Sequence, residues 1–147
     1  MTGELVYQIM IGSLIVILSV LLSALVFLLL ELMMERAHRW LIRPPHRAKL
    51  GLVLVVAVIG ALGMITVSVW VWALAYLWFG VFSTLEESLY FSLVSFTTLG
   101  FGDIILPVQW RILSGMNAAN GFLHIGMMSA VVLETMRQVR KNQLLGR

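Results

Sequence analysis

Cysteine is absent from the 147 residues, and charged side chains make up only 12% of them. Without cysteine the chain forms no disulfide, so thiols give no indication of a redox compartment. With 61% hydrophobic residues, the chain is far too apolar for a soluble domain of this size. Its basic residues lie between and after apolar segments rather than together on one polar face. This distribution argues against a nucleic-acid partner and favours a membrane protein.

Residues that could act as catalysts or metal ligands are also sparse. The three histidines, His38, His46 and His124, lie far apart, and no nucleophile–base pair or metal-ligand cluster is evident. The first 80 residues contain no apolar segment with regularly spaced arginines, which is the pattern of a voltage sensor. We therefore do not expect an enzyme or a voltage-sensing domain.

Three apolar segments are long enough to cross a bilayer, which takes about 20 residues. They run from Leu5 to Leu30, from Leu50 to about Gly80, and from about Ile112 to Leu133. The first lacks a positively charged start and a cleavage site, so we interpret it as a retained helix rather than a signal peptide. We divide the chain into an N-terminal helix with a basic loop (1–49), a domain with two spans (50–133) and a short tail (134–147).

The basic residues predict how the chain is oriented. The segment 31–49 carries five arginines and lysines and the segment after Leu133 carries four, whereas Arg111 alone lies between the second and third spans. Because positively charged segments stay in the cytoplasm, we expect 31–49 and the C-terminus to be cytoplasmic. The N-terminus is then external. The sequence predicts a multi-pass protein of the cell membrane, in contact with lipid.

Two features mark the ends of the spans. The pair Pro44-Pro45 is expected to break any helix in the basic loop. Four aromatic residues near the end of the second span are typical of an interfacial aromatic belt. These residues are Trp70, Trp72, Tyr76 and Trp78. Ordinary helix packing is an equally good interpretation for the first two.

A short helix is predicted between the second and third spans. Thr84 followed by Glu87 fits a capping box. From there to Thr97 is about a dozen residues, or ~18 Å of helix, which crosses only part of the ~30 Å hydrocarbon layer. We therefore expect a re-entrant helix whose C-terminal end, with its partial negative charge, favours a cation near mid-membrane. Irregular backbone after it is tolerated where it is buried or lines an ion path.

Directly after this helix, residues 98–103 read T-L-G-F-G-D. Glycine at alternate positions allows backbone conformations closed to other residues, so that successive carbonyl groups can turn to the same side. Four such strands around one axis form rings of oxygens that can replace the water around a potassium ion. The motif resembles the potassium-channel signature T-V-G-Y-G-D, with Leu99 in place of Val and Phe101 in place of Tyr.

From the second span to the tail, the chain is similar to the two-helix pore domain of small bacterial-type potassium channels. Together with the first span, the resemblance implies an all-α membrane fold with three transmembrane helices, a re-entrant pore helix and a filter loop, assembled as a homotetramer. It also implies that five residues form the filter, with K⁺ as the permeant ion held at the first four. These residues are Thr98, Leu99, Gly100, Phe101 and Gly102. The first span lies outside the resemblance.

The surroundings of the filter follow from the same resemblance. Asp103 matches the aspartate at the outer mouth, and Tyr90 and Phe91 fall where the family has aromatic residues behind the filter. Phe101 lacks the hydroxyl with which the family's tyrosine braces the filter. Acidic residues of the short helix either make the outer vestibule negative or cap the helix, and Arg111 is placed to offset the charge of Asp103.

Polar groups in the third span suggest an inner cavity. Asn117, Gly121, His124 and Met128 share one helical face by their spacing of i, i+4, i+7 and i+11. Polar groups at membrane depth face a cavity or a partner rather than lipid, so this face is our candidate for the cavity lining and gate. For Gly121, a hinge and close packing are equally supported. For His124, a hydrogen bond to a neighbouring helix competes with a role in permeation or pH sensing.

The sequence favours a potassium-selective channel of four chains, with one filter strand from each chain. Two alternatives remain open. One is a less selective cation channel of the same architecture. The other is a membrane scaffold or accessory subunit that keeps the loop without conducting. In each case we expect no cofactor other than K⁺ and no small-molecule substrate other than permeant cations.

Overall fold

The computed structural model describes residues 2–41 and 46–145, and within these ranges the chain is helical with no strand. The long helices are α1 (Thr2–Leu41), α2 (His46–Trp78) and α4 (Arg111–Leu145). Between the last two lie the short helix α3 (Leu85–Phe96) and the 3-10 turn η1 (Val108–Trp110). The all-α prediction is confirmed.

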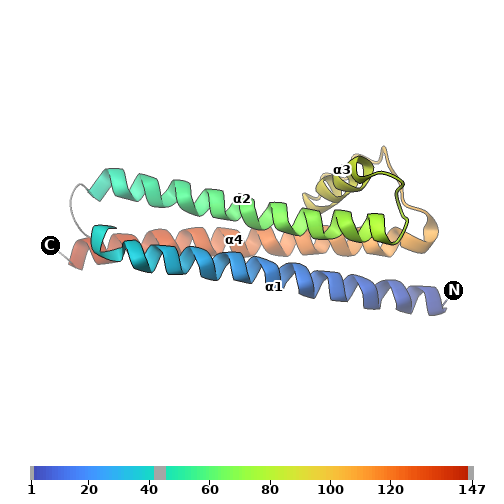
Figure 1. Ribbon diagram of the computed structural model, residues 1–147, viewed down its shortest axis with the longest axis horizontal. Helices are drawn as coiled ribbons and strands as arrows, with labels where there is room; N and C mark the ends of the chain where they lie inside the picture. Colours follow the sequence, from blue (N-terminus) through green and yellow to red (C-terminus); the bar gives the residue numbers. More distant parts are fainter. Residues whose placement is uncertain (1, 42–45, 146–147) are drawn as a thin grey trace.

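The three long helices lie side by side, and each packs against the other two (Figure 1). α3 sits at the end of the bundle where α2 ends and α4 begins, close to the N-terminus, and the C-terminus lies at the opposite end. The N-terminus and the loop that follows α3 are therefore on the same side of the bundle. This is the relative placement that three crossings of a membrane require.

Each long helix contains one of the predicted spans. The apolar stretches are Gly3–Met33, Gly51–Trp78 and Val108–Arg137, all long and apolar enough to cross a membrane. Their outward faces carry exposed leucine and isoleucine side chains, such as Leu14, Leu21 and Ile59. Such faces suit lipid rather than water. The chain is a multi-pass membrane protein.

The helices extend further than the spans. α1 continues through the first part of the predicted basic loop to Leu41, and α2 already begins at His46. Residues 31–41 contain no glycine or proline and are rich in good helix formers, which explains the extension. The predicted break at Pro44-Pro45 lies outside the described residues. The tail is likewise helical as far as Leu145.

The core lies at the end of the bundle near α3. Trp72 and Tyr76 are fully buried in it, and the Tyr76 ring packs edge-on against Phe82 and Phe91 at centroid distances of 6.0 and 5.4 Å. The aromatic-belt interpretation is therefore wrong for Trp72 and Tyr76, which stabilise the fold from inside. Trp78, 87% exposed, keeps the position expected of an interfacial residue.

Candidate functional site: the loop after α3 and its supports

The start of α3 is fixed by the cap that the sequence predicts. Thr84 has an extended backbone, and its hydroxyl oxygen accepts a hydrogen bond from the Glu87 backbone N–H at 3.2 Å. This bond satisfies one of the free N–H groups of the first turn. Glu86 and Glu87 in that turn are exposed and interact favourably with the helix dipole.

α3 is held against the long helices by buried contacts. The Ser92 hydroxyl donates to the Val69 carbonyl of α2 at 2.8 Å, and the Ser95 hydroxyl lies 3.4 Å from that of Ser114 on α4. The last residue, Phe96, is fully buried. Its backbone rests directly on Gly121, where a Cβ atom would overlap the Phe96 carbonyl oxygen. The C-terminal end of α3 is thus fixed to the middle of α4.

The chain turns sharply after α3. The backbone N–H groups of Leu99 and Gly100 both donate to the Val94 carbonyl, at 3.1 and 3.3 Å. Thr98 has a φ of +60°, and it is the one non-glycine residue with positive φ in the described ranges. A β-branched residue in this conformation costs about 1–3 kcal/mol and is found where the surrounding structure enforces it.

The backbone alternates in handedness along this loop. Thr98, Gly100 and Gly102 have φ values of +60°, +54° and +76°, whereas Leu99 and Phe101 between them have negative φ. In an ordinary strand successive residues point to opposite sides. Positive φ at every second residue departs from that pattern and allows successive carbonyl groups to turn to the same side. The glycines therefore adopt the conformation that the sequence analysis required of them, and Thr98 adopts it too.

Tyr90 of α3 holds the far end of the loop. Its hydroxyl donates to a carboxylate oxygen of Asp103 at 2.5 Å. This bond, aided by backbone N–H groups of Asp103 and Ile104, lowers the pKa of Asp103 below its usual range, against a smaller opposing effect of desolvation. The same bond raises the pKa of Tyr90, because loss of the proton would break it. Asp103 is therefore an anion at neutral pH.

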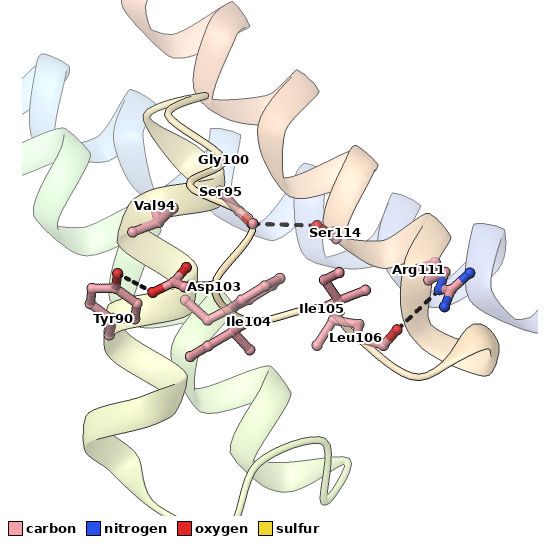
Figure 2. Close-up of a pocket in the computed structure, with 12 residues that line it drawn as sticks. Tyr90, Val94, Ser95, Gly100, Asp103, Ile104, Ile105, Leu106, Arg111 and Ser114 are labelled. Carbon is pink, nitrogen blue, oxygen red and sulfur yellow. Dashed lines mark hydrogen bonds between the residues drawn. The ribbon is translucent and has the colours of Figure 1, made fainter.

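A pocket of about 220 Å³ lies behind the loop, between α3 and the start of α4 (Figure 2). Asp103 faces Tyr90 on one side of it, and Arg111 lies on the other side, where its Nε donates to the Leu106 carbonyl at 3.1 Å. The expectation that Arg111 offsets the charge of Asp103 is not met within the chain. The side-chain partner of Asp103 is the neutral Tyr90.

Apolar side chains of the loop point away from the chain's own core. Leu99 is 60% exposed and Phe101 is 66% exposed. The Phe91 ring packs against Tyr76 and Phe82, so the aromatic support expected behind Phe101 is not supplied by Phe91 of the same chain.

The predicted cavity lining is wrong. The face of α4 that carries Asn117, Gly121, His124 and Met128 packs inside the chain against α1, α2 and α3, and the side chains on it are buried. A side chain covered by its own chain cannot line a cavity between chains. The face of α4 left open is the opposite one. It carries Gly115, Ala119, Phe122 and Gly126.

Polar groups on the buried face find partners on neighbouring helices, although among the described residues the side-chain oxygens of Asn117 and Asn120 have none. The Asn117 amide donates to the Tyr76 hydroxyl at 3.3 Å, and His124 Nε2 lies 2.8 Å from the Ser23 hydroxyl of α1. Of the two interpretations of His124, the hydrogen bond to a neighbouring helix is the one observed. Sequence reasoning missed the serines of α1, although polar residues spaced by four within an apolar span were a usable signal.

Comparison with known proteins separates α1 from the rest of the chain. Neither curated proteins nor solved structures gave a match. The family model described as "Ion channel" matches residues 52–138, which include most of α2, all of α3 and the loop after it, and most of α4. This match covers more than half of the chain and excludes α1. The chain therefore belongs to the ion channel family.

Proposed function

We propose that the protein is a potassium-selective channel formed by four copies of the chain. The filter is the strand from Thr98 to Gly102, whose carbonyl oxygens replace the water around K⁺. The observation that carries this proposal is the alternation of left-handed residues at Thr98, Gly100 and Gly102. Such a backbone can turn successive carbonyl oxygens to one side of the strand, which is what a row of dehydrated cation sites needs.

The need for four copies follows from the strand itself. Each chain contributes one strand, and a ring around a K⁺ ion needs several carbonyl groups at each level. The exposure of Leu99 and Phe101 supports the same assembly, because large apolar side chains beside an aqueous ion path need cover from another copy. In this assembly α3 is the re-entrant pore helix, and its C-terminal end points toward the cation.

The inner cavity is lined by the open face of α4. Gly115, Ala119, Phe122 and Gly126 lie opposite the face that packs on the rest of the chain. The cavity below the filter is then apolar and contains no titratable group from this stretch of α4.

The outer mouth is acidic and faces the outside of the cell. Support for the orientation comes from the basic residues beyond the ends of the spans that lie away from α3. Asp103, held as a carboxylate by Tyr90, attracts cations to the mouth of the filter.

Flux through purified protein tests the proposal. The protein is reconstituted in liposomes loaded with potassium, and potassium efflux is measured with and without barium, which has nearly the size of K⁺ and twice its charge. We expect efflux that barium blocks, and a reversal potential that follows the potassium gradient rather than the sodium gradient. Native mass measurement is expected to give a tetramer.

A less selective cation channel is the second candidate, and one observation favours it. Phe101 has no hydroxyl to anchor the filter, and its ring is exposed within the chain, so the strand has fewer restraints from its own chain. Equal permeation of sodium and potassium would establish this candidate. Absence of any cation flux from assembled protein would instead point to a scaffold or accessory subunit.

A further inference from the structure

α1 lies outside the residues that match the ion channel family, yet polar side chains fasten it to the matched helices. Ser19 and Ser23 of α1 are fully buried, as are Ser68 of α2 and Asn120 and His124 of α4. The α1 span has no charged residue between positions 5 and 30. Ser19 and Ser23 are its side chains that contact the polar groups of α2 and α4.

The five side chains form a closed ring of hydrogen bonds. The Asn120 amide donates to the Ser19 hydroxyl at 2.8 Å, and Ser19 donates to the Ser68 hydroxyl at 3.2 Å. Ser68 lies 3.1 Å from the Ser23 hydroxyl, and Ser23 lies 2.8 Å from His124 Nε2. His124 Nδ1 closes the ring at 2.9 Å from the backbone carbonyl oxygen of Asn120. The ring joins all three long helices.

The direction of each bond in the ring follows from its chemistry. A carbonyl oxygen only accepts, so Nδ1 of His124 carries the hydrogen that it gives to Asn120. In the neutral imidazole Nε2 is then an acceptor, and it receives the hydrogen of Ser23. Ser68 in turn donates to Ser23. Every hydroxyl in the ring accepts one bond and donates one. Ser68 also lies 3.2 Å from His124 Nε2, so it can donate there when Ser23 is absent. Removal of Ser19, in contrast, takes away the hydroxyl that joins Asn120 to Ser68 and opens the ring.

The ring is placed on both sides of Gly121. Asn120 precedes this glycine and His124 follows it by one turn of helix. α4 runs unbroken through Gly121, from Arg111 to Leu145. A bend at the glycine would turn Asn120 and His124 relative to each other, whereas the serines that hold them lie on the separate helices α1 and α2. The closed ring is therefore compatible with a straight α4 and is opened by a bend.

A second contact fixes α4 to α1 at the start of α4. The side-chain oxygen of Gln8 accepts a hydrogen bond from the Ile112 backbone N–H at 3.2 Å, in the first turn of α4. Gln8 is itself buried. Gly12, one turn further along α1, leaves room for Met116 of α4. α1 thus follows α4 from its first turn to the ring.

We propose that α1 is a positioning helix for α4: through Ser19 and Ser23 it holds α4 straight at Gly121 and thereby sets the balance between the conducting and non-conducting forms of the pore. The proposal rests on the proposed function, in which α4 lines the ion path. In the membrane no water replaces a lost partner, so the ring resists movement of α4 more strongly than the same bonds would at a wet surface.

Single-channel recording from purified protein in planar bilayers tests the proposal. The variants are Ser19→Ala, Ser23→Ala and the double variant, and Ser13→Ala is the matched control. Ser13 is a half-buried serine of the same helix and does not belong to the ring. The readouts are the ratio of open to closed time, the single-channel conductance and the potassium–sodium reversal potential. A purely structural role would reduce the number of channels and leave that ratio unchanged.

An interhelical hydrogen bond in a membrane changes an equilibrium by about threefold on average. We expect Ser19→Ala to change the ratio of open to closed time by at least about threefold, with unchanged conductance and selectivity. Ser23→Ala should change the ratio less but in the same direction, because Ser68 can donate directly to His124. The double variant should give about the same change as Ser19→Ala alone, because the loss of Ser19 already opens the ring. Ser13→Ala should behave as the wild type.

Two results would overturn the proposal. One is an open-to-closed ratio equal to that of the wild type in Ser19→Ala. The other is a double variant whose change equals the product of the single changes, which would mean that the serines act independently. In both cases a wild type that conducts potassium leaves the proposed function intact. A wild type that conducts no cation overturns the proposed function instead.

Discussion

Gly121→Ala is expected to disturb the filter although residue 121 lies outside it. The new Cβ would overlap the Phe96 carbonyl oxygen and lie 2.6 Å from the Phe96 carbonyl carbon, whereas ordinary contact begins at 3.4 Å. The carbonyl carbon therefore has to retreat by at least about 0.8 Å and the overlapped oxygen by more. The obstructing atoms are backbone, which cannot rotate away as a side chain can. Thr98 follows Phe96 by two residues, so the first residue of the filter moves with it.

The expected size of the effect comes from two opposing contributions. Overpacking of this kind costs about 1–3 kcal/mol, and replacing glycine by alanine within a helix returns up to about 1 kcal/mol. The net cost is about 1 kcal/mol in each chain. Since about 1.4 kcal/mol corresponds to a tenfold change in an equilibrium constant, this cost shifts the equilibrium between the native and a displaced filter severalfold. We therefore expect lower thermal stability of the assembly and a severalfold loss of potassium-over-sodium selectivity.

The assay compares reversal potentials under potassium–sodium gradients and the temperature at which the assembly dissociates. The control is Gly63→Ala on α2, where nothing lies within 4 Å of the new Cβ and only the helix-propensity gain remains. If Gly121→Ala keeps both the selectivity and the stability of the control, the close contact between α3 and α4 does not position the filter, and the reasoning is refuted.

Three further predictions concern the filter, its mouth and the cavity. Gly100→Ala should abolish selective flux, because a left-handed φ costs a non-glycine residue about 1–2 kcal/mol in every strand; efflux of potassium and sodium measures this. Tyr90→Phe should move the response of the current to external acid to higher pH. Because the pKa of Asp103 is lowered, its negative charge attracts cations at neutral pH and is lost only as the pH falls below the usual aspartate range. Without the Tyr90 hydroxyl, the pKa of Asp103 returns toward that range, so the charge is lost at a higher pH. Ala119→Cys should react with a charged thiol reagent and lose current, whereas Met128→Cys, inside the chain, should not; the chain has no other cysteine.

Each of these predictions has a result that contradicts it. Normal selectivity in Gly100→Ala would mean that the strand does not hold K⁺ by its backbone. Identical pH profiles for the wild type and Tyr90→Phe would mean that the hydroxyl does not govern the charge of Asp103. Reaction at Met128→Cys but not at Ala119→Cys would mean that α4 presents its other face to the ion path.

The sequence predicts the fold well because the signals that determine it are local. Long apolar runs define the membrane helices, Thr84 marks the start of α3, and alternate glycines allow the left-handed backbone after it. Each of these depends on residues close together in the chain. The alternation of handedness at Gly100 and Gly102 could be expected for the same reason.

The orientation of α4 about its own axis could not be predicted in this way. Asn117 and His124 are polar, which excludes lipid but does not distinguish a watery cavity from a neighbouring helix. The answer depends on Ser23 and Tyr76, which are distant in sequence and lie on other helices. The bond between Tyr90 and Asp103 escaped prediction for a similar reason, since it depends on how the loop turns back along α3.

The length of α4 gives the ring at His124 a mechanical consequence. From His124 to Leu145 the helix continues for 21 residues, or about 32 Å at 1.5 Å per residue. If the ring acts as a fulcrum, a tilt of about 10° there moves the far end of α4 by about 5–6 Å over that length. The end of α4 remote from the filter carries Arg137, Arg140 and Lys141 on its surface. A displacement of a few Å at that end therefore corresponds to a rotation of only a few degrees of α4 at the ring.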